Sequence, residues 1–149
     1  MPAAQRTVEI DAPLATVLAT ITDFASYPRF LPDMDEANVL RASPGTWEVA
    51  FAVRVIRPLR YTLKLVATSP TEITWTLLEG AFRSNDGGWS LEALSPIRTR
   101  ATYRIDIAVG LYVPGNIVNS LVQVSLPDTL ARFKAEAERR ARGVPEIYA

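Results

Sequence analysis

The chain contains no cysteine and no histidine. Without cysteine it can form neither disulfides nor thiolate metal sites. Without histidine it lacks the commonest general base, the commonest transition-metal ligand and the Ser-His and Cys-His pairs of nucleophilic enzymes. These two absences favour binding over catalysis, and we expect neither a cofactor nor a metal site.

The chain also lacks an excess of either charge, because 16 Lys and Arg residues balance 16 Asp and Glu residues. Proteins that bind nucleic acids are usually basic, so we expect no nucleic-acid partner. No run approaches the ~20 apolar residues that span a bilayer. The opening residues MPAAQRTVEIDAPL carry no apolar signal core. We therefore expect no stable membrane insertion and a cytoplasmic location.

Two helical regions flank the rest of the chain. Apolar residues recur at helical spacing from Leu14 to Ile21, which predicts a helix over 13–24. The proline-bounded stretch 26–32 has room for one further helical turn. A long amphipathic helix is predicted over 116–142, and Pro127 should kink or interrupt it. Its apolar stripe consists of Leu126, Leu130 and Phe133, and its basic C-terminal end is interpreted as a face in water.

Between these helices the apolar period changes to two, which predicts seven strand-like segments. They are 35–41, 46–55, 60–68, 72–79, 81–85, 89–94 and 98–109, and a further strand is predicted over 5–11, before the first helix. Asn85-Asp86-Gly87-Gly88 is the strongest hairpin signal, because positive φ costs little there, so 81–85 would pair with 89–94. The polar and apolar alternation of 98–109 is typical of an antiparallel sheet with one face in water. This order predicts an α+β fold, with a helix across a curved sheet that encloses an apolar cavity.

Several short motifs carry a resemblance to a known superfamily. They are Ile10-Asp11-Ala12-Pro13, the segment Asp23-Phe24-Ala25-Ser26-Tyr27-Pro28-Arg29-Phe30-Leu31-Pro32, the Gly80-Ala81-Phe82 turn, and Trp89. Together with the element order, they make the chain similar to the START-like (SRPBCC, helix-grip) superfamily. Within it the chain resembles the polyketide cyclase/dehydrase and coenzyme Q-binding families. The likeness extends over nearly all of 1–149, which we interpret as one START-like ligand-binding domain.

The resemblance implies a helix-grip fold, in which a curved seven-stranded antiparallel sheet wraps around a long C-terminal helix, with two short helices after the first strand. It also implies a deep cavity that holds a lipid, sterol, quinone or polyketide-like molecule. Binding or transport of such a hydrophobic molecule is the leading interpretation. A polyketide cyclase, aromatase or dehydratase is the first alternative, and an interaction protein like the ribosome-association toxins is the second. The zero net charge counts against ribosome association, and a weak homodimer is left open.

Large apolar side chains dominate one face of every predicted strand, more than one helix can cover. This pattern predicts a cavity of a few hundred cubic ångströms, roughly the usual scale of a ligand pocket. The residues expected to bind ligand are Tyr27, Phe30, Phe51, Tyr61, Trp75, Leu77, Trp89, Tyr103, Ile105, Leu126, Leu130 and Phe133.

Glu79 is the polar residue with two interpretations. Simple alternation places it on the apolar face of Trp75 and Leu77, where a lone buried carboxylate would cost several kcal/mol or have a raised pKa. We expect instead that the strand ends at Gly80 and that Glu79 reaches water or pairs with Arg83. Otherwise Glu79, Arg83 and Tyr103 are the candidates for catalytic groups in the cavity.

Overall fold

The computed structural model describes residues 3–54, 58–109 and 126–143. The elements, in chain order, are β1 (Ala3–Ile10), α1 (Leu14–Thr22), the 3-10 turn η1 (Phe24–Ser26), α2 (Tyr27–Phe30), β2 (Met34–Ser43), β3 (Thr46–Arg54), β4 (Pro58–Ser69), β5 (Glu72–Gly80), β6 (Phe82–Ser95), β7 (Arg98–Val109) and α4 (Leu126–Ala141). None of the described helices is long and apolar enough to cross a membrane.

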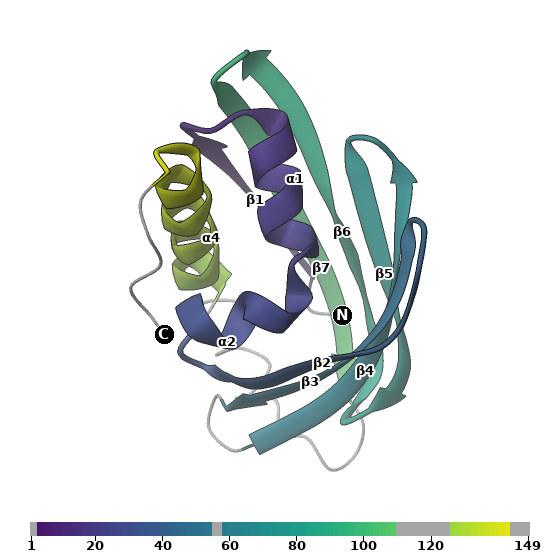
Figure 1. Ribbon diagram of the computed structural model, residues 1–149. Helices are drawn as coiled ribbons and strands as arrows, with labels where there is room; N and C mark the ends of the chain where they lie inside the picture. The colour runs from purple at the N-terminus through teal and green to yellow at the C-terminus, as the bar shows by residue number, and fades with distance from the viewer. Residues whose placement is uncertain (1–2, 55–57, 110–125, 144–149) are drawn as a thin grey trace.

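The seven described strands form one antiparallel sheet in the order β1-β7-β6-β5-β4-β3-β2. The sheet curves, and α1, α2 and α4 lie on its concave side (Figure 1). Strand β7 is 12 residues long and runs antiparallel to β6, so that Tyr103 lies opposite Trp89. The predicted α+β helix-grip fold, with short helices after the first strand, is confirmed.

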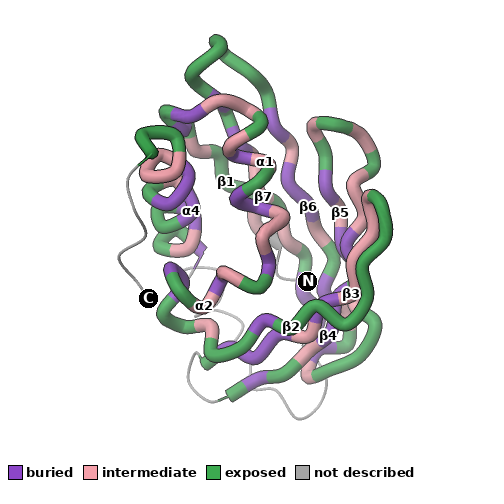
Figure 2. The backbone as a smooth tube through the Cα atoms, in the orientation of Figure 1, coloured by how far each residue is buried: buried purple, intermediate pink, exposed green. Residues whose placement is uncertain are grey.

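The apolar residues of the concave side form the core. Buried positions follow the inner face of the sheet and the inward sides of the helices (Figure 2). In α4 the predicted stripe of Leu126, Leu130 and Phe133 is buried. Residues 116–125 of the predicted long helix lie outside the described residues. Pro127 is the second residue of α4, so the interruption expected there stays a prediction.

The hairpin predicted at 85–88 is wrong. Strand β6 runs unbroken from Phe82 to Ser95, and Gly87 lies opposite Trp75 of β5 and Ile105 of β7. Neither Gly87 nor Gly88 has a positive φ. A Cβ atom on Gly87 would lie 2.6 Å from the Trp75 ring. Glycine therefore lets a neighbouring residue come close to the β6 backbone here. A sequence pattern cannot distinguish this use of glycine from a turn.

The reversal between β5 and β6 occurs earlier, at Gly80 and Ala81. Gly80 has φ 137°, a conformation that L side chains rarely adopt. A Cβ atom at this position would lie 2.5 Å from the Tyr61 backbone, and the next amide, that of Ala81, donates to the carbonyl oxygen of Arg60. Glycine is thus required at this reversal for both its dihedral angle and its small volume.

Candidate functional site

A cavity of about 160 Å³ lies between the helices and the concave face of the sheet, and it is partly open to solvent. Its volume is smaller than the few hundred cubic ångströms predicted. Most residues that we expected to bind ligand line it, and they come from α2, α4 and strands β3 to β7. They are Tyr27, Phe51, Tyr61, Trp75, Trp89, Tyr103, Ile105, Leu126 and Phe133.

Phe30, Leu77 and Leu130 do not line the cavity. Phe30 and Leu130 are buried in the core, and Leu77 packs against the core from a partly buried position. The Phe30 ring lies edge-on to Tyr27 and to Phe133, with ring centroids 5.9 and 5.2 Å apart. The alternation and helical spacing correctly put these side chains on the inner face. Phe30 supports the wall from behind, because it packs against Tyr27 and Phe133, which line the cavity.

The cavity wall is built from aromatic side chains that contact one another. Tyr103 lies between Trp75 and Trp89, at centroid distances of 5.3 and 4.9 Å. Phe133 of α4 meets Trp89 and Tyr27 edge-on, at 5.2 and 5.1 Å. Aromatic pairs of this kind add about 0.5–1.5 kcal/mol each beyond the area that they bury. The rings therefore hold one another in place, and the wall is stiff.

Two tyrosine hydroxyls in this wall have no partner among the described residues. The phenol groups of Tyr61 and Tyr103 make no hydrogen bond to any described residue, and no buried polar side-chain atom of the described residues is left without a partner. Both hydroxyls are thus in contact with the cavity. Burial raises the pKa of Tyr61 and of Tyr103 well above its ordinary value, and the nearby Tyr61 raises that of Tyr103 further. These groups stay protonated near neutral pH and can donate a hydrogen bond.

Asn85 is a cavity residue that sequence reasoning missed. It is buried, with 4% of its surface exposed, and its Oδ1 accepts a hydrogen bond of 3.2 Å from Nε1 of Trp75. The hairpin interpretation places Asn85 in a turn and so excludes it from the cavity wall. A signal was present in the sequence, because Asn85, Gly87 and Trp89 follow the period of two that places them on one face of a strand.

Glu79 and Arg83 lie outside the cavity wall and are exposed. The pairing of β4 with β5 shifts by one residue, because Thr62 lies opposite Glu79 while Leu63 lies opposite Leu77. This bulge reverses the alternation and takes Glu79 off the apolar face. A second irregularity between Phe82 and Ser84 exposes Arg83 in the same way. Of the three catalytic candidates, Tyr103 alone lines the cavity.

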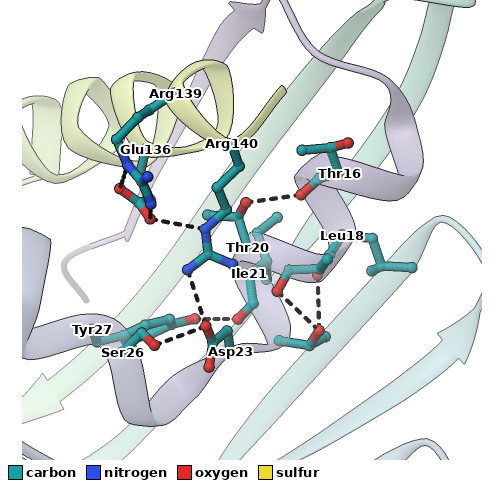
Figure 3. A network of polar contacts seen from close by, with 12 residues as sticks. Thr16, Leu18, Thr20, Ile21, Asp23, Ser26, Tyr27, Glu136, Arg139 and Arg140 are labelled. Atoms are coloured by element: carbon teal, nitrogen blue, oxygen red, sulfur yellow. Dashed lines mark hydrogen bonds and ion pairs between the residues drawn. The ribbon is translucent and has the colours of Figure 1, made fainter. Parts of the chain in front are cut away.

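The basic end of α4 is divided, because Arg132 and Arg142 face water as expected, whereas Arg139 and Arg140 belong to a partly buried polar network. Glu136 is 2% exposed and pairs with both following arginines (Figure 3). Arg139 donates to both carboxylate oxygens, at 3.0 and 2.7 Å, and Nε of Arg140 donates to Oε2 at 2.8 Å. Burial alone would raise the pKa of Glu136, but the hydrogen bonds and charges of the two arginines outweigh it and lower the pKa.

Arg140 carries this network across to the helices at the start of the chain. Its Nη2 donates to Oδ2 of Asp23 at 3.0 Å, and the same oxygen accepts a hydrogen bond from Ser26 (Figure 3). Asp23 lies between α1 and η1, one residue before Phe24 of the cavity wall. The network therefore fixes α4 against the α1–η1 junction, on the helical side of the cavity. Within the described ranges, no group of three or more acidic side chains could hold a metal ion.

Residues 10–134 match the family described as polyketide cyclase/dehydrase and lipid transport. The chain belongs to this family. The match covers the motifs at 10–13, 23–32 and 80–82, and it confirms the superfamily predicted from them. A curated relative is the ribosome association toxin RatA of Escherichia coli K12, which is 28% identical over 107 residues, 71% of this chain and 68% of RatA.

Solved structures show the same fold. The ZhuI aromatase/cyclase from Streptomyces sp. R1128 superposes with a TM-score of 0.82 and 21% identity, over 97% of this chain and 99% of that one. A START superfamily protein from Mycobacterium smegmatis superposes with a TM-score of 0.75 and 24% identity, over 95% of this chain and 97% of that one. At these identities the likeness shows the fold. Family and fold together support either hydrophobic ligand binding or polyketide cyclisation.

Proposed function

We propose that this protein binds and carries a hydrophobic small molecule, with one or two rings of the ligand held in the cavity. The observation that supports this most directly is the aromatic wall around about 160 Å³ of space. A cavity of about 150 Å³ in another protein accommodates benzene, which sets the scale. A sterol or a long lipid chain would have to extend through the open part of the cavity.

The groups of the inner wall favour carrying over catalysis. General acid–base catalysis needs a group that exchanges protons near the working pH. The wall offers the neutral hydroxyls of Tyr61, Tyr103 and Thr129 and the amide of Asn85, whereas Asp33 is an exposed residue of the cavity lining. Burial raises the pKa of both tyrosines, so neither is a base near neutral pH. These groups can orient a ligand by hydrogen bonds.

A cavity-filling variant tests this function. Titration with 2-isopropenylnaphthalene should give saturable binding of one molecule per chain, detected by the fluorescence of Trp75 and Trp89 in the wall. Ile105→Trp should abolish binding, because Ile105 lines the cavity and the larger side chain occupies the space. Val39→Trp, at a position 41% exposed on β2, is the matched control and should bind as the wild type does.

Two outcomes of these experiments would contradict the carrier function. Unchanged binding by Ile105→Trp would place the ligand elsewhere on the protein. Native mass spectrometry of the protein purified from its own host should reveal a retained apolar molecule. This molecule should keep its mass during incubation with the purified protein. A cyclised or dehydrated product would instead assign the function to catalysis.

Polyketide cyclisation is the second candidate, and the family match and the likeness to ZhuI favour it. In that case Tyr103 would be the polar group at the substrate, and Tyr103→Phe should eliminate product formation while ligand binding persists. Ribosome association, which the name of the relative RatA suggests, is the third candidate. Co-sedimentation of the protein with ribosomes in a sucrose gradient tests it, and the balanced charge of the chain predicts no co-sedimentation.

A further inference from the structure

The amide of Asn85 has only one orientation that satisfies its neighbour. The indole Nε1 of Trp75 carries a hydrogen and can only donate. The atom of Asn85 that faces it at 3.2 Å must therefore be the carbonyl oxygen Oδ1. This requirement turns the Nδ2 group, with its two hydrogens, away from Trp75. The direction of the amide is thus determined by chemistry, even though oxygen and nitrogen have nearly the same shape.

The Trp75 ring that imposes this orientation is itself held in place. It lies across the backbone of β6 at Gly87, where a Cβ atom would be 2.6 Å from ring atom Cζ2. The ring of Tyr103 packs against it at a centroid distance of 5.3 Å. The Asn85 and Gly87 pair of the supposed hairpin motif therefore has a role in the cavity wall. Gly87 makes room for the indole ring, and Asn85 binds its N–H group.

The Nδ2 group of Asn85 is available to a molecule in the cavity. The described residues give it no hydrogen-bond acceptor, although Asn85 is only 4% exposed and lines the cavity. Among those residues no buried polar side-chain atom lacks a partner, so this nitrogen is not sealed inside protein. It is an oriented donor in a wall that is otherwise mostly apolar.

We propose that Asn85 is a specificity-determining residue whose amide donates a hydrogen bond to a carbonyl oxygen of the ligand. This proposal rests on the proposed ligand-binding function and names the ligand class as uncharged ketones and related carbonyl compounds. A carbonyl group that enters an apolar cavity loses its hydrogen bonds to water, and the amide replaces one of them. The cavity lining includes no lysine or arginine among the described residues, so a carboxylate would gain no ion pair.

Two probes of matched shape test the proposal. In 2-isopropenylnaphthalene a CH₂ group replaces the carbonyl oxygen of 2-acetylnaphthalene, and the two molecules are otherwise alike. The ratio of their dissociation constants reports the contribution of the carbonyl group and cancels the apolar contacts that they share. Asn85→Leu should reduce the affinity for the ketone relative to the hydrocarbon by about tenfold, the usual effect of one hydrogen bond. Asn38→Leu, at an exposed position of β2, should leave the ratio unchanged.

A second measurement applies if Asn85→Leu does not fold. The infrared carbonyl stretch of bound 2-acetylnaphthalene is recorded in the Tyr61→Phe, Tyr103→Phe, Thr129→Val triple variant, in which the other hydroxyls free to donate into the cavity are absent. A stretch at lower wavenumber than in hexane supports donation from Asn85, and a stretch equal to that in hexane overturns it. If both probes bind and Asn85→Leu leaves their ratio unchanged, the role of Asn85 is overturned while ligand binding stands. If neither probe binds the wild type, both proposals are overturned.

Discussion

The tyrosines of the apolar interior use their hydroxyls in different ways. Tyr27 donates to the backbone carbonyl oxygen of Ile21, at the C-terminal end of α1. The last carbonyl groups of a helix have no N–H group of a following turn to bond with. The Tyr27 hydroxyl supplies the missing donor. The hydroxyls of Tyr61 and Tyr103 meet no described acceptor and contact the cavity. The same residue type thus stabilises the helix end in one case and remains available for a ligand in the others.

Tyr27→Phe should lower the free energy of unfolding by about 1 kcal/mol, because it leaves the buried carbonyl of Ile21 without a donor. In a chain of this length that corresponds to a fall in Tm of about 2–4 °C. Urea unfolding followed by circular dichroism measures the change. Tyr103→Phe is the matched control and should be nearly neutral, because its hydroxyl has no partner to lose among the described residues. An equal loss in both variants would contradict the different roles of the two hydroxyls.

Individual wall residues could be predicted from the sequence wherever the strands are regular. Alternation placed Trp75, Trp89 and Tyr103 correctly in the cavity wall. It failed for Glu79, because a bulge adds one residue to β5 and reverses the side-chain direction, and period counting cannot detect a bulge. It failed for Asn85 because the glycines that follow it are also typical of a turn.

At the scale of elements, β6 is the strand that shapes the cavity wall. Gly87→Ala should lower the free energy of unfolding by about 2–3 kcal/mol, since the added methyl group would meet the Arg104 carbonyl oxygen at 2.2 Å and the Trp75 ring at 2.6 Å. The displaced indole should also change the near-ultraviolet circular dichroism. Gly143→Ala is the control, because nothing lies within 4 Å of the added methyl group. It should lose only about 1 kcal/mol for its positive φ, with the same near-ultraviolet spectrum. A smaller loss at Gly87 than at Gly143 would contradict the close packing.

Helix α4 depends on the carboxylate of Glu136, which the sequence pattern does not distinguish from the other acidic residues of the helix. Glu136→Gln should lower the free energy of unfolding by about 2 kcal/mol at neutral pH, because Arg139 and Arg140 lose their buried counter-charge. This value lies between those typical of exposed and of fully buried ion pairs. Asp128→Asn is the control, because its pair with Arg132 is exposed on both sides, and it should cost less than about 1 kcal/mol. Urea unfolding of the three proteins at one pH measures both effects.

The pH dependence of the same pair gives an independent check. The pKa of Glu136 is lowered in the folded protein from its ordinary value of 4.5, so the unfolded chain takes up the proton first as the pH falls. The stabilisation is therefore complete above that ordinary value and is lost as the pH falls through the folded pKa. The difference between wild type and Glu136→Gln should shrink accordingly below about pH 4.5. A difference that stays constant through this range would show that the ionised carboxylate is not the source of the stability.

The fold of the whole molecule could be predicted more fully than its site. The order of helical and strand periods, together with the motifs at 10–13 and 23–32, identifies the superfamily, and the family match over 10–134 confirms it. The cavity follows from the excess of large apolar residues on the inner face. Its volume does not follow, because it depends on how rings from different elements pack against each other, as Phe133 does against Trp89. No periodicity contains that information.

The strand order imposes a sequence of events on a chain leaving the ribosome. Strands β2 to β6 each pair with a neighbour in the chain, so this meander can assemble as it emerges. Strand β1 pairs with β7, and Val8 lies opposite Ala101. Strand β1 therefore has no native partner until β7 is complete, and closing so long a loop is slow. Throughout that interval the apolar side chains of Val8 and Ile10 lack the strand beside which they pack in the folded protein.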